Sequence, residues 1–225
     1  MDAPQAVIFD VDGTLLSTGG AGGRSWGRAS LRLYGQEADI TEFTDTGMTD
    51  PQVGTEVFRH VHERDPSPDE LAELISSYLW FLPDEISASE GYKVLPGARE
   101  TLERLNAHDV PVGIVTGAME AGSHAKLGRG QLNGLLQFGG FGSDSPDRTE
   151  ITLKAIARGA HLLGRELRPE QCYIVGDTPK DVQAAHAAGA IAVGVASHKY
   201  TREQLAESEP EHLLDALTEP LPGLP

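Results

Sequence analysis

The sequence predicts an α/β protein with a doubly wound, Rossmann-like parallel sheet and a helical domain inserted after the first strand. Short apolar runs of strand length alternate with amphipathic stretches along most of the chain. Such alternation is typical of a parallel sheet that helices cover on both faces. One interval, from Leu15 to about Tyr92, lacks strong strand signals and is far too long for an ordinary strand-to-helix connection. These observations together predict the fold class.

The predicted strands are short, apolar and followed by small or polar residues. They cover residues 6–10, 110–115, 172–175 and 191–195, with a weaker candidate at 138–141. Amphipathic helices are predicted over residues 97–107, 150–163 and 179–188. Gly189 follows the last of these, and glycine commonly ends a helix.

The interval after the first strand carries helix signals. Asp50 followed by Pro51 is typical of an N-cap and a first helical turn. Ser67 with Glu70 three residues later has the pattern of a capping box. Apolar residues then recur at helical spacing, which predicts a long helix.

We therefore divide the chain into two domains. The core domain comprises residues 1–16 and 92–225, and the helical domain comprises residues 17–91. The glycine-rich residues 19–23 and the region near residues 90–92 are the expected hinges, because the chain crosses between the domains there.

Composition argues against several classes of protein. With 39% hydrophobic and 23% charged residues, the 225-residue chain has the composition of an ordinary globular protein. No window approaches eighteen consecutive apolar residues, so we expect no membrane-spanning helix. The net charge of −16, with lysines scattered singly, argues against a nucleic-acid surface.

We expect a cytoplasmic protein that is a monomer or a homodimer. Its single cysteine, Cys172, cannot form an internal disulfide and fits a reducing compartment. The first predicted strand begins within about eight residues of Met1, which leaves little room for a secretory signal. The proline-rich residues 209–225 are expected to be partly disordered.

Asp10 and Asp12 are the strongest candidates for a functional site. Alternate residues of a strand point the same way, so these side chains project together where the first strand ends. Open parallel sheets bind ligands at this edge. Two neighbouring carboxylates repel each other unless a cation or a proton lies between them, and oxygen ligands of this kind suit Mg²⁺. Gly13 permits a tight turn, and Thr14 can cap the segment after it.

The run DVDGTL at residues 10–15 resembles the first motif of the haloacid dehalogenase-like superfamily. The resemblance covers all of the chain except its final segment and is nearest to phosphoglycolate phosphatase-like members. It implies that Asp10 is a nucleophile that forms an aspartyl-phosphate. It also implies that Asp12 acts as general acid, then base, and gives its backbone carbonyl to a magnesium ion. The helical domain would then be a cap that closes over a small phosphorylated metabolite.

Two further motifs of the family have counterparts in this chain. Thr116 and Gly117 follow a core strand, where the resemblance implies that the hydroxyl and nearby amides bind phosphate. Asp177 follows the strand at 172–175 and would complete the magnesium site with the two aspartates of the first motif. Asp181, at the start of the next helix, would hold a metal-bound water or the cationic residue of the site.

The third family motif usually carries a lysine, and this chain departs from that pattern. The matching stretch is residues 145–151, where we choose Arg148. Its guanidinium could neutralise the nucleophile and the phosphate together. Lys154 and Lys180 are the alternatives.

The resemblance implies a Mg²⁺-dependent phosphatase that acts on phosphoglycolate-like compounds or sugar phosphates. A phosphosugar mutase would share the core and stays open. The presence of Asp12 argues against a true dehalogenase, and the lack of lysine between Leu15 and Tyr92 argues against a phosphonoacetaldehyde hydrolase. A receiver-like phospho-switch is a non-enzymatic alternative, but its phosphorylated aspartate would end the third strand, and no insert would follow the first.

Overall fold

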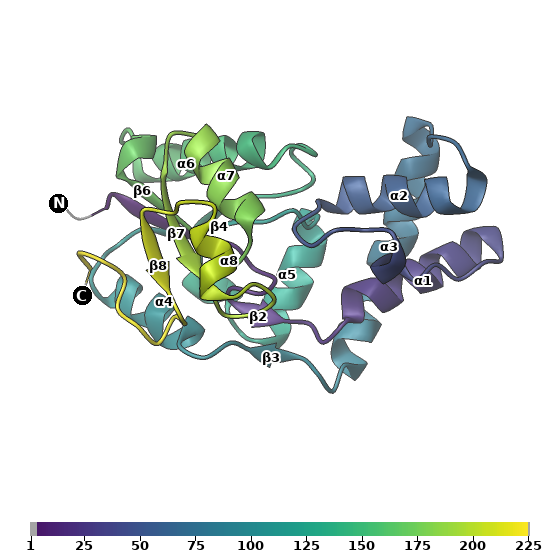
Figure 1. The fold of residues 1–225 in the computed structure, drawn as a ribbon, viewed down its shortest axis with the longest axis horizontal. Helices are drawn as coiled ribbons and strands as arrows, with labels where there is room; N and C mark the ends of the chain where they lie inside the picture. The colour runs from purple at the N-terminus through teal and green to yellow at the C-terminus, as the bar shows by residue number, and fades with distance from the viewer. Residues whose placement is uncertain (1–3, 225) are drawn as a thin grey trace.

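The computed structural model describes residues 4–224 and is built on a six-stranded, wholly parallel sheet (Figure 1). The strands lie in the order β5-β4-β1-β6-β7-β8. Their bounds are β1 Ala6–Phe9, β4 Val112–Val115, β5 Phe138–Gly140, β6 Cys172–Gly176, β7 Ile191–Val195 and β8 His212–Leu214. Because β1 is central and pairs with β4 and β6, these three strands end side by side. The predicted fold class is confirmed.

Helices cover both faces of the sheet, as expected of a doubly wound fold. The core helices are α4 Ala98–Ala107, α5 Glu120–Arg129, α6 Arg148–Leu163, α7 Pro179–Ala187 and α8 Arg202–Ala206, with short turns η2 Asn133–Leu135 and η3 Pro169–Gln171. Val7 and Phe9 of β1 pack on the face covered by α4 and α5. Ala6 and Ile8 pack on the face covered by α6 and α7. The strand is therefore apolar throughout, because both of its faces are buried.

The inserted segment forms a separate lobe, at the right of Figure 1, that we call the cap. It comprises α1 Ala21–Tyr34, η1 Ile40–Glu42, α2 Asp50–His62 and α3 Pro68–Ala88. Its helices share an apolar core in which the ring of Trp26 stacks on that of Tyr78 with centroids 4.0 Å apart. Over the described residues, no helix is both long and apolar enough to cross a membrane.

The two predicted helix starts in the cap have different outcomes. The capping box of Ser67 and Glu70 is present at the start of α3. The prediction that Asp50 is the N-cap of α2 is wrong, because Thr49 is the N-cap and Asp50 is the first helical residue. The Asp50 carboxylate instead accepts a hydrogen bond from the backbone amide of Met119 in the core.

Two chain crossings join the cap to the core and lie side by side. β2 (Leu16–Ser17) and β3 (Lys93–Val94) form an antiparallel ribbon, which the sequence did not reveal because two residues are too few for a pattern. Gly19 has a φ of 60°, and a side chain there would overlap the backbone of Gly91. Close approach of the two crossings thus needs glycine at position 19, and a Cβ atom at Gly91 would lie 3.1 Å from the Gly19 Cα atom. The domain boundaries and the hinge role of these residues stay predictions.

The C-terminal segment lies against the core, so the expected partial disorder of residues 209–225 is wrong for the part that the structure describes. β8 extends the sheet, and Leu217 and Leu221 are buried in the core on the α4 face. The Thr101 hydroxyl of α4 donates to the Leu217 carbonyl over 2.9 Å. Leucines spaced along the proline-rich segment therefore anchor it, and prolines are compatible with this irregular path.

Candidate active site

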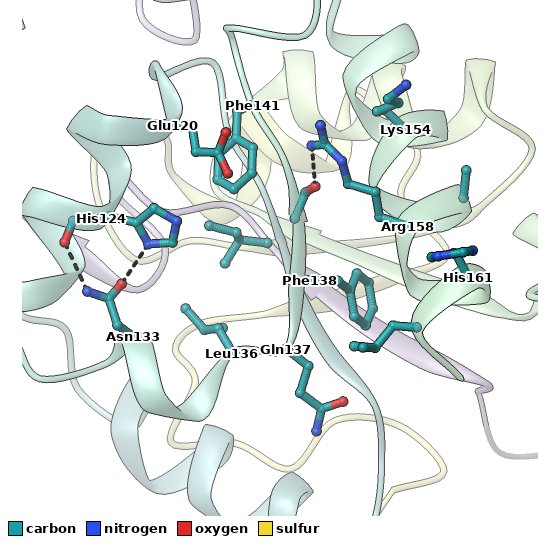
Figure 2. Close-up of a pocket in the computed structure, with 14 residues that line it drawn as sticks. Glu120, His124, Asn133, Leu136, Gln137, Phe138, Phe141, Lys154, Arg158 and His161 are labelled. Carbon is teal, nitrogen blue, oxygen red and sulfur yellow. Dashed lines mark hydrogen bonds between the residues drawn. The ribbon is translucent and has the colours of Figure 1, made fainter. Parts of the chain in front are cut away.

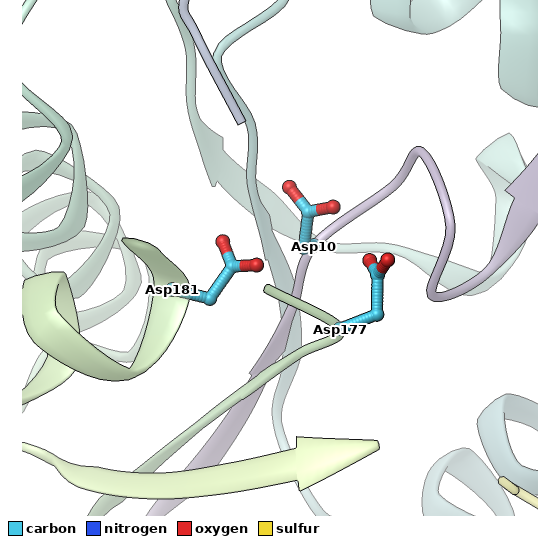
Figure 3. Close-up of side chains that lie close together, drawn as sticks. All are labelled: Asp10, Asp177 and Asp181. Carbon is cyan, nitrogen blue, oxygen red and sulfur yellow. The ribbon is translucent and has the colours of Figure 1, made fainter. Parts of the chain in front are cut away.

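Three carboxylates gather where the central strands end, as Figure 3 shows. Asp10 follows β1, Asp177 follows β6 and Asp181 lies in the first turn of α7. One oxygen of each lies within 4.8 Å of the others, and all three residues are buried. The structure thus brings together three of the residues predicted from the sequence, because the carboxyl ends of parallel strands meet at one edge.

Burial and the charges of neighbouring carboxylates make two members of this cluster, Asp10 and Asp177, hard to ionise. Burial raises the pKa of Asp10 well above its ordinary value, the Asp181 charge raises it further, and the guanidinium of Arg148 opposes both. Burial and then the Asp181 charge raise the pKa of Asp177 to about 7, against a lowering hydrogen bond from Thr14. A cluster of this kind calls for a cation to balance it.

The surroundings of Asp177 fit a small divalent cation. Its Oδ1 accepts a hydrogen bond from the Thr14 hydroxyl over 3.0 Å, whereas its Oδ2 is buried and has no hydrogen-bond partner among residues 4–224. Gly13 has a φ of 95°, and a side chain there would overlap the Asp177 carboxylate. Carboxylate oxygens are among the ligands that Mg²⁺ prefers.

Arg148 is the cationic residue that lies against Asp10. As the first residue of α6, it places Nη2 3.2 Å from Asp10 Oδ1 and hydrogen-bonds Asp181 Oδ1 with the same atom. Nη1 donates to the Gly47 carbonyl of the cap over 3.3 Å. Burial disfavours the charged guanidinium, but the Asp181 and Asp10 carboxylates more than offset this and raise the pKa of Arg148.

The two alternative cations lie elsewhere. Lys154 lines a separate cavity of about 580 Å³ beside β5, together with Phe138, Phe141 and Arg158 (Figure 2). Lys180, in the first turn of α7, packs beside Gly47 of the cap. Of the three candidates in the sequence, the structure therefore places Arg148 at Asp10.

Asp12 lies apart from the carboxylate cluster and pairs with Lys126 of α5. The Lys126 ammonium is 2.6 Å from Asp12 Oδ2, and the lysine side chain is only 7% exposed. Burial disfavours its charge, but the Asp12 and then the Asp50 carboxylate raise the pKa of Lys126. Sequence reasoning missed this residue. Its only signal was a lysine directly before Leu127, on the buried face of α5, where a lysine needs a partner.

Thr116 and Gly117 follow β4 and lie under the cap. The Thr116 hydroxyl is buried and accepts a hydrogen bond from the Ala118 amide over 3.1 Å. A Cβ atom at Gly117 would lie 2.9 Å from the Cα atom of Thr49. The glycine therefore allows the cap loop to approach, and the Asp50 amide donates to its carbonyl over 2.7 Å.

A small polar cavity of about 150 Å³ lies between the core and the cap. Core residues form most of its lining, and one loop of the cap with the first residue of α2 completes it. The lining residues are Asp10, Asp12, Thr116, Gly117, Ala118, Lys126, Arg148, Thr178 and Asp181 of the core, and Thr46, Gly47, Met48 and Asp50 of the cap.

Asp50 is the charged residue that the cap contributes to this cavity. Its Oδ2 accepts a hydrogen bond from the Met119 amide over 2.8 Å. Burial raises the pKa of Asp50 to about 6, although the Lys126 charge lowers it. In the same loop, the Thr49 hydroxyl donates to the Pro146 carbonyl over 3.3 Å. The cap loop is thus bonded to core segments that carry Gly117 and Arg148.

Comparison with known sequences agrees with this geometry. A family model described as haloacid dehalogenase-like hydrolase matches residues 4–189. The phosphoglycolate phosphatase of Rhodospirillum rubrum is 29% identical over 211 residues, which cover 90% of this chain and 83% of that protein. The phosphoglycolate phosphatase of Salmonella choleraesuis is 31% identical over 137 residues, which cover 61% of this chain and 53% of that protein. The match thus spans about half the length of this second relative.

A solved structure has the same fold. The crystal structure of a predicted phosphoglycolate phosphatase from Haemophilus somnus superposes with a TM-score of 0.74 at 22% sequence identity. The superposition covers 96% of each chain, so both the sheet and the cap have counterparts there.

Proposed function

Because the chain belongs to the haloacid dehalogenase-like hydrolase family, we propose that it is a Mg²⁺-dependent phosphatase of small phosphorylated metabolites. Candidate substrates are phosphoglycolate-like compounds and sugar phosphates, hydrolysed through an aspartyl-phosphate on Asp10. The observation that carries the proposal is the buried Asp10 carboxylate, which contacts the Arg148 guanidinium and has an oxygen within 4.8 Å of one of Asp177. The phosphoglycolate phosphatases among its relatives support it.

The proposed reaction has two transfers. In the first, an Asp10 oxygen forms a bond to phosphorus while the ester bond breaks, and Asp12 gives its proton to the departing oxygen. In the second, water attacks the phosphorus, Asp12 takes its proton and the bond to Asp10 breaks. Inorganic phosphate and the free carboxylate of Asp10 result. Arg148 balances the charge of Asp10 and of the phosphate through both transfers.

The proposed metal site comprises the carboxylates of Asp10 and Asp177 with the backbone carbonyl of Asp12, and Asp181 supports it through Arg148. A bound Mg²⁺ would supply charge neutralisation for the phosphate oxygens and for the clustered carboxylates. The hydroxyl of Thr116 and the amides near Gly117 are proposed to bind the remaining phosphate oxygens.

The size of the cavity supports a small substrate. About 150 Å³ between core and cap leaves room for a phosphate and a short organic group. The cap loop, bonded to the core near Gly117 and Arg148, would exclude bulk water during the first transfer. We place this activity in the cytoplasm, in a monomer or a homodimer, on the basis of the composition and the single cysteine.

Hydrolysis of 4-nitrophenyl phosphate tests the chemistry directly. We expect turnover with Mg²⁺, none after removal of the metal by EDTA, and none in Asp10→Asn. Activity that survives EDTA, or full activity in Asp10→Asn, would rule out the mechanism. A panel of phosphoglycolate, sugar phosphates and polyol phosphates would then identify the substrate. Release of inorganic phosphate distinguishes a phosphatase from a phosphosugar mutase, which would return an isomeric phosphate ester.

A further inference from the structure

We propose that Lys126 is a positioning residue for proton transfer, because its ammonium group fixes which oxygen of Asp12 carries the transferable proton. The inference rests on the proposed function, in which Asp12 is the general acid and base. It assigns a role to a buried lysine that takes no part in the two proposed transfers.

In the pair of Lys126 and Asp12, the lysine is buried and the aspartate is partly exposed. Lys126 Nζ lies 2.6 Å from Asp12 Oδ2, and its side chain is 7% exposed, whereas that of Asp12 is 41% exposed. Both residues line the cavity between core and cap. A buried side chain on α5 therefore holds a carboxylate whose remaining surface faces the cavity.

Hydrogen-bond chemistry then determines where a proton on Asp12 resides. An ammonium group has three donors and no acceptor, so the Oδ2 that it contacts must accept. A proton on Oδ2 would point at these donors. When Asp12 is protonated, its proton therefore lies on Oδ1, the oxygen that Lys126 does not hold.

The proton balance of both transfers depends on this placement. In the first transfer, Oδ1–H gives its proton to the ester oxygen as the bond between that oxygen and phosphorus breaks and the Asp10–phosphorus bond forms. In the second, Oδ1 takes a proton from the attacking water as the Asp10–phosphorus bond breaks. Lys126 keeps its own protons throughout and acts only by holding Oδ2.

The cap completes the environment of this lysine. Asp50, the first residue of α2, is the second carboxylate whose charge acts on Lys126. Its amide and its Oδ2 are both bonded to the core, at the Gly117 carbonyl and the Met119 amide. Docking of this loop thus adds a second carboxylate to the cavity that Lys126 lines, and its charge favours the ammonium form of the lysine.

The dependence of kcat/KM on the leaving group of the ester distinguishes a positioning role of Lys126 from a merely structural one. A dinitrophenolate departs without a proton, whereas the alkoxide of glycerol 1-phosphate needs one. The value of kcat/KM reports only steps up to the first transfer. We expect Lys126→Met to lower kcat/KM about 100-fold for glycerol 1-phosphate, in the usual range for loss of general acid catalysis, and only a few-fold for 2,4-dinitrophenyl phosphate.

The controls use the same two substrates. Lys126→Arg keeps N–H donors at this position and should restore most of the activity on glycerol 1-phosphate. Asp12→Asn should show the same leaving-group dependence of kcat/KM as Lys126→Met. Lys154→Met, an exposed lysine beside the other cavity, should change neither value. The ratio of the kcat/KM values for the two substrates, measured in one preparation, does not depend on the fraction of the protein that is folded. Lys126→Gln serves the same measurement if the methionine variant does not fold.

Three outcomes would contradict the inference. Equal losses on both substrates in Lys126→Met would show that the lysine is structural or binds phosphate. A Lys126→Arg variant with the leaving-group dependence of Lys126→Met would contradict the role of the donors. Both results presuppose an active wild-type enzyme. A wild-type protein that hydrolyses neither ester would instead contradict the proposed function, and the inference with it.

Discussion

Arg148 shows how far a single residue can be predicted from the sequence. The third family motif departs from lysine in this chain, so Arg148 was chosen there with two lysines left as alternatives. Arg148 and Lys154 lie close to the expected position along the chain, and Lys180 lies further on, inside the fourth motif. Only the start of α6 decides among them, because it brings the Arg148 guanidinium to 3.2 Å from Asp10. The catalytic role of Arg148 stays a prediction.

We expect Arg148→Ala to lower kcat on 4-nitrophenyl phosphate by about 100-fold or more, the usual effect of losing a charge-stabilising donor in the reaction. Without the guanidinium, Asp10 loses its contact cation and Asp181 is left unpaired. Lys154→Ala is the matched control and should keep near wild-type activity, since its side chain is exposed beside another cavity. A larger loss in Lys154→Ala than in Arg148→Ala would reverse the assignment.

Asp177 allows a test of the metal site that does not depend on turnover. Its Oδ2 is buried without a partner among residues 4–224, so a bound cation should stabilise the folded protein. We expect Mg²⁺ to raise the Tm of the wild-type protein and to have little effect on Asp177→Asn. Asp109→Asn, an exposed turn residue with a φ of 55° that asparagine tolerates, should respond like the wild type. An equal Mg²⁺ response in Asp177→Asn would contradict the site.

At the scale of elements, periodicity predicted the long units and failed on the short ones. The five predicted strands all occur, since four of them are largely buried apolar runs and the weaker candidate at 138–141 has small, buried glycines after Phe138. The ribbon of β2 and β3 was missed because its strands have two residues each. β8 was missed because its sequence lies in a proline-rich segment, which argued for disorder. Local patterns are also misleading where a residue serves a second element, as the Asp50 carboxylate does by bonding the core instead of capping α2.

The approach of the cap loop to β4 can be tested through Gly117. Its Cβ would lie 2.9 Å from the Thr49 Cα atom, so Gly117→Ala should push the cap loop away from the core. We expect kcat/KM for small phosphate esters to fall at least several-fold, because closure completes the cavity. Gly134→Ala in η2, where no atom lies within 4 Å of the added Cβ, should keep its activity. It should also gain about 0.4–1 kcal/mol of stability. Wild-type kinetics in Gly117→Ala would contradict this loop contact.

On the scale of the whole molecule, the net charge of −16 and the clustering of carboxylates both disfavour the ionisation of carboxyl groups at the site. The metal-free protein should resist ionisation at the site as pH rises. A carboxyl whose pKa is raised on folding contributes stability that is complete below its unfolded pKa. That stability is lost as pH rises through the folded pKa, which is about 7 for Asp177 and about 6 for Asp50. The stability of the metal-free protein should therefore fall between about pH 4, near the unfolded pKa of a carboxyl, and just above pH 7.

We expect the free energy of unfolding of the wild-type protein in EDTA to fall relative to that of Asp177→Asn across this window. Asparagine does not titrate, so the variant lacks this contribution. The change should be on the order of a few kcal/mol, since each pKa unit corresponds to about 1.4 kcal/mol. Urea denaturation at several pH values measures it. A difference between the two proteins that stays constant with pH, or changes in the opposite sense, would contradict the raised pKa of Asp177.

The site as a whole divides into a part that sequence could predict and a part that it could not. Asp10, Asp177 and Asp181 follow strand ends or begin the next helix, and parallel topology brings such positions together. Lys126 and Asp50 gave no such signal. Their positions depend on how α5 packs against the core and on how the cap loop docks, and no local pattern encodes either.

The central place of β1 also constrains the order in which the molecule can fold. β1 pairs with β4 and β6, which lie about 100 and 165 residues further along the chain, so its contacts are strongly non-local. The cap helices contact one another over much shorter separations and should form early. During synthesis, Asp10 is made long before Asp177, so the two carboxylates cannot come together until the chain has been extended to Asp177. The helical lobe that covers the carboxylates is therefore expected to form before the carboxylates themselves meet.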